Sequence, residues 1–416
     1  MAPHTPQRSS RPGKPGARLD VPPRWRVVLA LFVVVSGISM SVSAFGVFLP
    51  VLNATFGWTR GAISVALSIN LALGGAAAFA VASVADRRGP RGVLALTVVI
   101  GAAGLLLTSR IGALWQFYVS YGVMVGIGFS SVYVLTTATV ARWFAERRGL
   151  AFAVVLSGFN LGWLIGGPVA AMLIARLGWR TAYVVLGLVV FGLGVPACLR
   201  VRYPQPVDVT RGDAISGREM TSSTVRASLR SALSDRRLWL LASGWFSTGL
   251  VFMMVTAHCV PFARDRGLPL ERASLLLTAY GIGSAAGRLG SGLVADRFGA
   301  TATMYLCVAI QALALGVLVG APPAWALMPV LVVFGVGASG ADNAVVKIVP
   351  EVFGLAALAS VMSVLSLGWR LGAALGPAGA GFLYDLTRSY TVPFSSGLAI
   401  LAVSVLFLRL ATRHSR

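Results

Sequence analysis

Charged residues are scarce in this chain of 416 residues: only 12% are Asp, Glu, Lys or Arg, whereas 56% are hydrophobic. Soluble domains carry about 25% charged residues, so the composition indicates an integral membrane protein rather than two or three soluble domains. Acids are rarer than bases, which gives a formal net charge of +22. Such a charge can indicate nucleic-acid binding, but the placement of the basic residues gives a different explanation.

Lysine, histidine and cysteine are too rare to build the common enzymatic sites. The only lysines, Lys14 and Lys347, do not belong to a phosphate-binding loop, so ATP hydrolysis is not expected. The three histidines lie too far apart for a metalloprotease helix motif, and the three cysteines form neither a disulfide framework nor a metal spacing: His4, His258, His414, Cys198, Cys259 and Cys307. The sequence therefore predicts no metal and no cofactor.

Twelve apolar stretches are long enough to cross a bilayer, which takes about 20 residues in a helix. We predict spans at residues 26–50, 62–85, 92–110, 114–141, 150–175, 181–200, 238–261, 273–295, 301–320, 324–346, 355–384 and 391–410. The basic tail before the first span, residues 1–25, resembles the start of a signal peptide. The apolar run is too long and no cleavage site follows it promptly, so we expect an uncleaved helix.

The basic residues predict the orientation of these spans. With both termini in the cytoplasm, the tails and cytoplasmic loops hold 25 of the 35 Lys and Arg residues, and the opposite loops hold eight. This is the positive-inside pattern, and it removes the need for a nucleic-acid partner. We therefore predict a multi-pass protein of the cell (inner) membrane, in contact with the lipid bilayer and acting as a monomer, with both termini cytoplasmic.

One long polar segment, residues 201–237, divides the spans into two sets of six. The predicted units are an N-terminal six-helix bundle, a cytoplasmic central loop, a C-terminal six-helix bundle and a short cytoplasmic tail: residues 26–200, 201–237, 238–411 and 412–416. Because six is even, a second copy of the first set would have the same orientation as the first.

The two sets repeat the same features in the same order. Asp86-Arg87-Arg88-Gly89 follows the second span, and Asp296-Arg297-Phe298-Gly299 follows the eighth, 210 residues later. Glycine ridges recur at the same offset, where small residues let helices approach closely: Gly158, Gly162, Gly166, Gly368, Gly372 and Gly376. Parallel repeats of this kind place the binding site between the halves, near the middle of the membrane.

The charges of the repeated turns can pair or cap neighbouring helix ends. We predict that they form a conformational latch, with these members: Asp86, Arg87, Arg91, Asp296 and Arg297. The alternative is ordinary loop charge that follows the positive-inside rule.

The repeated turns resemble the signature loop of the major facilitator superfamily. Trp143-Phe144-Ala145-Glu146-Arg147-Arg148-Gly149-Leu150-Ala151, Gly178-Trp179-Arg180 and Gly287-Arg288 resemble its monocarboxylate and oxalate/formate branch. The resemblance covers nearly all spans and implies an all-α integral membrane fold of twelve transmembrane helices in two pseudo-symmetric six-helix bundles. Ala82 stands where the family's first loop usually begins with glycine. The first span lacks the lysine of animal monocarboxylate carriers, and the fourth lacks the arginine of many proton-coupled relatives. Proton symport and anion exchange therefore both stay open.

Three charged residues lie inside predicted spans, where charge is costly and marks function. Arg288 offers a permanently charged fork for a carboxylate, and in the resembling family an arginine on this helix binds the substrate carboxylate. Arg370 is a candidate second cation for the substrate. Asp342 is expected to be a counter-ion or a proton carrier. The alternative for either arginine is a structural pair with Asp342.

Neutral polar residues of the spans complete the predicted substrate site. His258 can donate a hydrogen bond or take up a proton, and similar bacterial lactate carriers have a histidine here. Tyr133 resembles a family tyrosine that touches the substrate, with Tyr121 as a weaker alternative. Asn160, at offset 210 from Arg370, is a candidate cavity group. Each of these residues could instead serve helix packing or interfacial solvation.

Two cations against one acid within the spans leave a spare positive charge for an anion. We predict a secondary active transporter of a small organic anion, a monocarboxylate such as lactate or pyruvate, with protons as a candidate coupling ion. The alternatives are a facilitator carrier of a neutral or cationic solute, including efflux, and a transporter-like sensor. Gly337-Ala338-Ser339-Gly340 with His258 would suit an intramembrane serine protease, but their predicted depths disagree, so no enzyme is expected.

Overall fold

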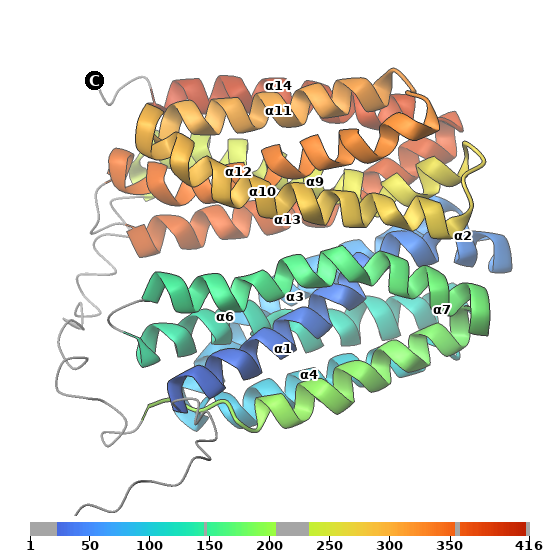
Figure 1. Ribbon diagram of the computed structural model, residues 1–416, viewed down its shortest axis with the longest axis horizontal. Helices are drawn as coiled ribbons and strands as arrows, with labels where there is room; N and C mark the ends of the chain where they lie inside the picture. The colour runs from blue at the N-terminus through green and yellow to red at the C-terminus, as the bar shows by residue number, and fades with distance from the viewer. Residues whose placement is uncertain (1–22, 145–147, 205–232, 354–357, 413–416) are drawn as a thin grey trace, which may run out of the picture.

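The chain folds into two helical bundles that lie side by side (Figure 1). The computed structural model describes residues 23–144, 148–204, 233–353 and 358–412, and these residues form helices without a strand. The first half comprises α1 (Pro23–Ser43), α2 (Phe45–Phe56), α3 (Arg60–Arg88), α4 (Pro90–Thr108), α5 (Leu114–Phe117), η1 (Tyr118–Val125), α6 (Gly126–Trp143) and α7 (Arg148–Cys198). The second comprises α9 (Arg236–Arg264), α10 (Leu270–Phe298), α11 (Ala300–Val319), η2 (Ala324–Ala326), α12 (Leu327–Phe353), α13 (Leu358–Thr387) and α14 (Thr391–Thr412).

These helices make twelve membrane spans, as the sequence predicts. Nine segments of the described chain are long and apolar enough to cross a bilayer. One of them, Gly149–Cys198, holds two spans because Gly178 breaks the helix at φ 78°. The other two spans are α10 and α13, with 29 and 30 residues, which carry the intramembrane arginines Arg288 and Arg370. Apolarity alone therefore misses the two helices that bear an internal arginine.

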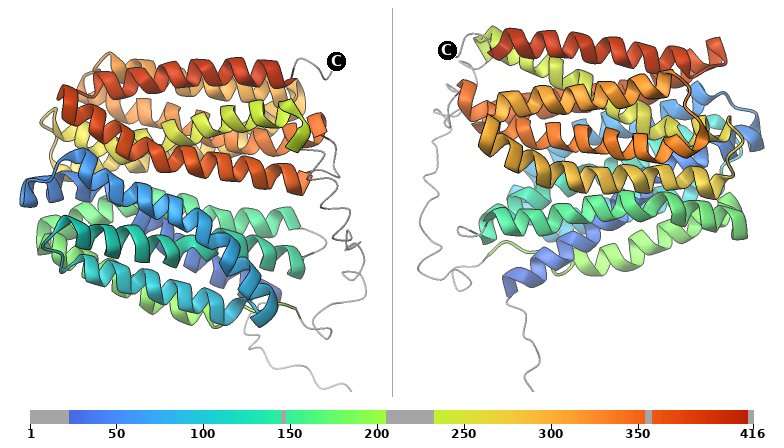
Figure 2. Two further views of the ribbon diagram at one scale, coloured as in Figure 1. Left: turned by 180° about the vertical axis from the view of Figure 1, so that it is seen from behind. Right: turned by 45° about the horizontal axis from the view of Figure 1, so that its top comes forward.

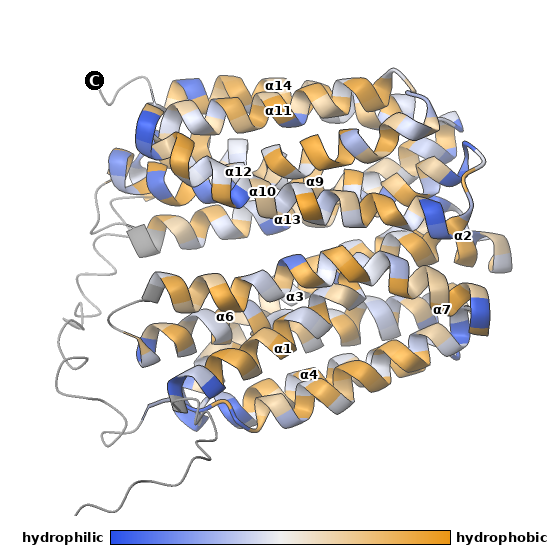
Figure 3. Cartoon of the chain, in the orientation of Figure 1, coloured by the Kyte–Doolittle hydropathy of each residue, from blue (hydrophilic) through white to orange (hydrophobic). Residues whose placement is uncertain are grey.

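Polar residues concentrate at the helix ends, and apolar residues cover most of the helix lengths between them (Figure 3). We name the two ends of the bundle by the chain. The terminal end holds the start of α1 at Pro23 and the end of α14 at Thr412, and the far end holds the α2–α3 and α13–α14 connections (Figures 1 and 2).

Each glycine ridge packs against the first span of its own half. Gly162 lies against Ser39 and Met40 of α1, and a Cβ at Gly162 would come within 2.6 Å of the Met40 nitrogen. Gly372 lies in the same way against the Phe246 carbonyl and Leu250 of α9. The duplicated sequence pattern therefore produces a duplicated helix contact, in which only glycine lets the two backbones meet.

The repeated Asp-Arg-x-Gly turns also adopt matching conformations. Gly89 ends α3 with φ 81°, and Gly299 ends α10 with φ 84°. This region of backbone space is accessible to glycine and strained for other residues. The glycines of the two turns are thus required by the sharp connection into α4 and α11.

The two halves contact each other through α3 against α13, α7 against α10 and α2 against α9. The tightest contact lies toward the far end, where a Cβ added at Gly381 of α13 would lie 2.6 Å from the Cα of Gly61 in α3. Toward the middle of the helices, Thr278 of α10 donates a hydrogen bond to the Leu164 carbonyl of α7 at 2.6 Å. These contacts hold the far end of the interface closed.

Several predicted features lie outside the described residues. These are most of the basic tail 1–25 and of the central loop 201–237, Glu146 and Arg147 of the segment after span four, and the tail after Thr412. The predicted unit boundaries therefore stay predictions, although α7 ends at Cys198 and α9 begins at Arg236.

The glycine ridge gives a first prediction, that Gly372→Ala destabilises the protein. The added methyl meets the Phe246 backbone, and overpacking of this kind costs about 1–3 kcal/mol, so the thermal midpoint in detergent should fall by several degrees. The matched control is Gly379→Ala on the same helix, where a Cβ meets nothing within 4 Å. Equal midpoints for the two variants would show that the close approach is not needed.

Candidate substrate site and the contacts that close it

Four of the predicted site residues gather between the two halves, near the middle of their helices. The phenol of Tyr133 in α6 lies within electrostatic range of Asp342 in α12, Arg288 in α10 and Arg370 in α13. Asp342 also lies within range of Arg288. The structure therefore brings together residues from one helix of the first half and three helices of the second.

The backbone of Arg288 is fixed by a neighbouring helix, whereas its side chain has no acidic partner in contact among the described residues. Asn343 of α12 donates hydrogen bonds to the Arg288 carbonyl at 3.3 Å and to Ser291 Oγ at 3.1 Å. Gly287 lets α12 approach so closely that an added Cβ would lie 2.8 Å from the Val336 Cα. The buried Nε of Arg288 has no hydrogen-bond partner among the described residues. A positioned guanidinium with an unused donor can accept a ligand oxygen.

Arg370 reaches the first half. A Cβ built on Gly75 of α3 would lie 3.3 Å from Arg370 Cδ, so the stem of this arginine crosses the interface where glycine leaves room. Within the described residues, neither Arg370 nor Arg288 forms an ion pair with Asp342 at contact distance. The alternative in which a direct pair neutralises one arginine is not seen in this conformation.

Tyr133 marks open space between the halves. It lies among charged residues of the opposite half, yet 52% of its surface is exposed. Because charged residues of the opposite half lie within electrostatic range of it, this exposed surface indicates space between the two bundles at this depth, in contrast to the far end.

The other two predicted site residues of the first half, Asn160 and Tyr121, lie in different places. Asn160 of α7 lies at the interface, where its Oδ1 accepts a hydrogen bond from Ser284 of α10 at 3.2 Å. Tyr121 is fully buried inside the first half, with its ring 5.4 Å from those of Phe45 and Phe117. Tyr121 thus belongs to the packing of its own half in this structure.

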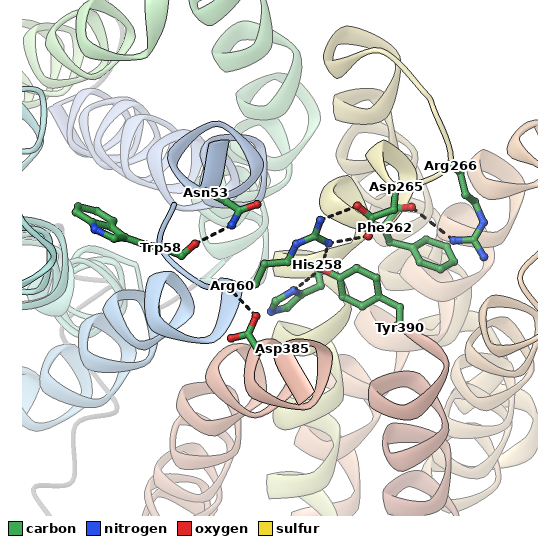
Figure 4. A network of polar contacts seen from close by, with 9 residues as sticks. All are labelled: Asn53, Trp58, Arg60, His258, Phe262, Asp265, Arg266, Asp385 and Tyr390. Carbon is green, nitrogen blue, oxygen red and sulfur yellow. Dashed lines mark hydrogen bonds and ion pairs between the residues drawn. The ribbon is translucent and has the colours of Figure 1, made fainter. Parts of the chain in front are cut away.

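A polar network at the far end joins the halves, and it centres on Arg60 (Figure 4). The guanidinium of Arg60, at the start of α3, donates to both oxygens of Asp265 at the end of α9, at 2.6 and 2.7 Å. It also lies 4.0 Å from the centre of the Tyr384 ring. A bidentate pair stacked on an aromatic face is among the stronger contacts an arginine can make.

Asp385 strengthens the same junction by capping a helix of the opposite half. Its carboxylate accepts from the backbone nitrogens of Arg60 and Gly61 at 3.1 and 2.8 Å. These nitrogens open α3 and have no partner within their own helix, and the positive end of the helix dipole favours an acid there. Asp385 of the second half therefore completes a helix of the first.

His258 belongs to this far-end network and not to the central cluster. It is fully buried, with Nε2 2.9 Å from the Pro377 carbonyl and Nδ1 3.0 Å from the Tyr390 hydroxyl. A carbonyl only accepts, so Nε2 carries the proton and Nδ1 accepts from Tyr390. Burial raises the pKa of Tyr390, which keeps this phenol protonated. Tyr390 in turn accepts from Arg60 at 2.9 Å.

The acids of the predicted latch pair at the terminal end, each within its own half. Asp86 lies 3.0 Å from Arg142, and Asp296 lies 2.6 Å from Lys347. Arg87, Arg91 and Arg297 form no ion pair among the described residues. The two pairs are equivalent by the repeat, because Arg142 and Lys347 lie 205 residues apart, the offset that also relates Glu146 to Glu351.

Sequence reasoning missed the far-end members Arg60, Asp265, Asp385 and Tyr390. Arg60 resembles any other loop arginine, and its partners lie 205, 325 and 330 residues away along the chain. No local pattern connects them. Arg142 and Lys347 were also missed, although the repeat offset could have identified them as a corresponding pair of cations.

The profile of the Major Facilitator Superfamily matches residues 30–273 and 259–416, which together span most of the chain. The chain belongs to this superfamily. It is 27% identical to monocarboxylate transporter 11 of Homo sapiens over 418 residues, covering 98% of this chain and 86% of that protein. It is also 25% identical to monocarboxylate transporter 13 of Rattus norvegicus over 392 residues, covering 93% and 88%.

Solved structures agree on the fold. A bacterial homologue of the human lysosomal transporter Spinster, in an inward-facing and occupied conformation, superposes with a TM-score of 0.73 at 17% identity, over 95% of this chain and 98% of that chain. The nucleoside transporter NupG gives 0.74 at 14% identity, over 94% and 99%. The predicted fold and the resemblance to the monocarboxylate branch are thus confirmed, and the protein is a membrane transporter, not an enzyme.

The far-end network leads to a second prediction, that Asp265→Asn loosens the closed far end. Ser64→Cys provides the probe, because Ser64 is fully buried 3.3 Å from His258, and the three native cysteines are buried as well. Without the second charge of the bidentate pair, labelling of Cys at position 64 by a polar maleimide should speed up several-fold. The control is Glu271→Gln, an exposed acid at the same end. If both variants leave the rate unchanged, the Arg60 pair does not close this end.

Proposed function

We propose that the protein is a secondary active transporter that moves a small organic anion, a monocarboxylate in the first instance, by alternating access. The observation that carries this proposal is the buried Nε of Arg288, which lacks a hydrogen-bond partner among the described residues and lies beside a solvent-open interface. A carboxylate would supply the acceptor oxygens and the negative charge that the guanidinium lacks.

The charge balance of the central site supports an anion. Two cations, Arg288 and Arg370, and one carboxylate, Asp342, lie within electrostatic range of Tyr133. Charges interact more strongly away from bulk water, so the uncompensated cation favours a bound anion. The names of the monocarboxylate transporters to which the chain is similar point the same way.

The roles follow from these positions. Arg288 would clamp the carboxylate, and Tyr133 would donate a hydrogen bond from the opposite half. Arg370 would supply the second positive charge. Asp342 would serve as counter-ion in the empty site or carry the coupling proton, so proton symport and anion exchange both remain compatible with the arrangement.

We infer the orientation and the conformational state on the same basis. By the positive-inside pattern of the sequence, the terminal end would lie on the cytoplasmic side of the cell (inner) membrane. The far end would then face outward. With the far end closed by the Arg60 network and Tyr133 exposed, this conformation would be inward-facing. The transport cycle would then break the Arg60–Asp265 pair, and His258 would act in this gate instead of binding the substrate.

A carrier of a neutral or cationic solute is the second candidate. Asp342 is the observation in its favour, because it is a carboxylate at the interface without a contact ion pair among the described residues. A cationic solute would have to approach two arginines to reach it, so the anion is favoured.

The clamp predicts that Arg288→Lys abolishes most uptake in proteoliposomes, by at least tenfold, while the protein still inserts. A lysine keeps the charge but replaces the planar fork by a point donor. Arg110→Lys, an exposed arginine of the far end, should transport normally. Full uptake by Arg288→Lys would remove this residue from the substrate site.

Ligand-induced stabilisation gives a further prediction about the solute class. A ligand that binds only the folded protein raises the thermal midpoint by mass action, so lactate, pyruvate and larger carboxylates should stabilise the purified protein while their neutral amides should not. Arg288→Ala should lose the shift. Equal shifts from acids and amides would reject the carboxylate clamp and favour a neutral solute.

A further inference from the structure

A directional chain of hydrogen bonds reaches the central site from within the second half. Ser284 of α10 donates to Asn160 Oδ1 across the interface at 3.2 Å, and its hydroxyl lies 2.6 Å from that of Ser339 in α12. A serine hydroxyl has a single proton. Since Ser284 gives its proton to Asn160, Ser339 must be the donor in the serine pair.

This chain fixes the amide of Asn160. With Oδ1 occupied by Ser284, the two N–H bonds of Nδ2 point elsewhere, and the one side-chain hydrogen bond of Asn160 to the described residues is the bond that Oδ1 accepts. Asn160 itself is half-buried, whereas Ser284 and Ser339 are buried at 2% and 0% exposure. The two serines therefore act as fixed supports, and the exposed part of the group is a pair of neutral N–H donors.

The Asn160 amide lies close to Arg288, the proposed carboxylate clamp. Ser284 precedes Arg288 by four residues in α10, and residues four apart share one face of a helix, separated by about 6 Å. The Asn160 amide bound to Ser284 is therefore about one helical turn from Arg288, on the side toward the closed far end. Tyr280, one turn further, packs its ring against Trp163 at 5.2 Å and limits the space beyond.

We propose that Asn160 is a specificity-determining residue, whose oriented amide donates a hydrogen bond to an oxygen next to the substrate carboxylate, as in a 2-hydroxy or 2-oxo acid. Ser284 and Ser339 are its positioning residues. The proposal rests on the proposed function of Arg288 as the carboxylate clamp. A site built to hydrogen-bond a substrate oxygen discriminates strongly against the analogue that lacks it, because the site's own polar group is then left unpaired.

The test compares lactate with propanoate, which has the same carbon skeleton without the hydroxyl. Binding to the purified full-length protein in detergent is measured by competition or calorimetry. The wild-type protein should bind lactate roughly tenfold more tightly than propanoate. Asn160→Leu, which keeps the shape and removes the donors, should weaken lactate about tenfold and leave propanoate unchanged, so that the preference disappears.

Two further variants separate this role from a structural one. Ser284→Ala keeps the Asn160 amide but frees its orientation, so it should reduce the preference about threefold. Asn343→Leu removes the side chain that holds the Arg288 backbone, so it should weaken both acids equally and keep the preference. Equal weakening of both acids by Asn160→Leu would overturn the proposal and assign Asn160 to packing between the halves.

The outcome for the wild-type protein distinguishes the two levels of inference. If neither acid binds, the carboxylate clamp itself fails. If both bind with the same affinity, and Asn160→Leu changes neither, the clamp stands and the oxygen subsite is wrong.

Discussion

The cost of placing charge among apolar helices governs this structure. A charge inside a span is tolerated where it faces the interior of the bundle or water, and the charges follow that rule. They gather in three places: the two equivalent pairs at the terminal end, the Arg288 cluster between the halves, and the Arg60 network at the far end. The second and third groups lie between the halves, whereas each terminal-end pair lies within its own half.

The three groups are not equally compensated. At the far end, Arg60 has a bidentate acid, an aromatic face and a phenol, and Asp385 caps its helix. At the centre, the buried Nε of Arg288 has no hydrogen-bond partner in the part of the chain that the structure describes. A satisfied network favours the closed contact, whereas an unsatisfied one favours a ligand. This contrast agrees with the proposal of a closed far end and a central substrate site, and it places His258 in the Arg60 network and not in the Arg288 cluster.

Internal duplication explains why some features occur twice and others once. The glycine ridges, the left-handed glycines and the terminal-end ion pairs are all doubled, because each serves contacts within a half. The Arg60 network and the central arginines have no copy in the other half. They lie between the halves, where each half meets a different partner. The internal sequence repeat therefore does not extend to the residues of the interface.

The twelve spans, the repeat, the packing ridges and the depth of Arg288, Arg370 and Asp342 within the spans could all be predicted from the sequence. These follow from local periodicity, spacing and the cost of charge in lipid. The sequence does not show which polar groups meet. Arg60 and Asp265 are 205 residues apart, and Asn160 and Ser284 are 124 apart. Such pairs depend on how the two bundles face each other, and no short-range sequence pattern predicts that arrangement.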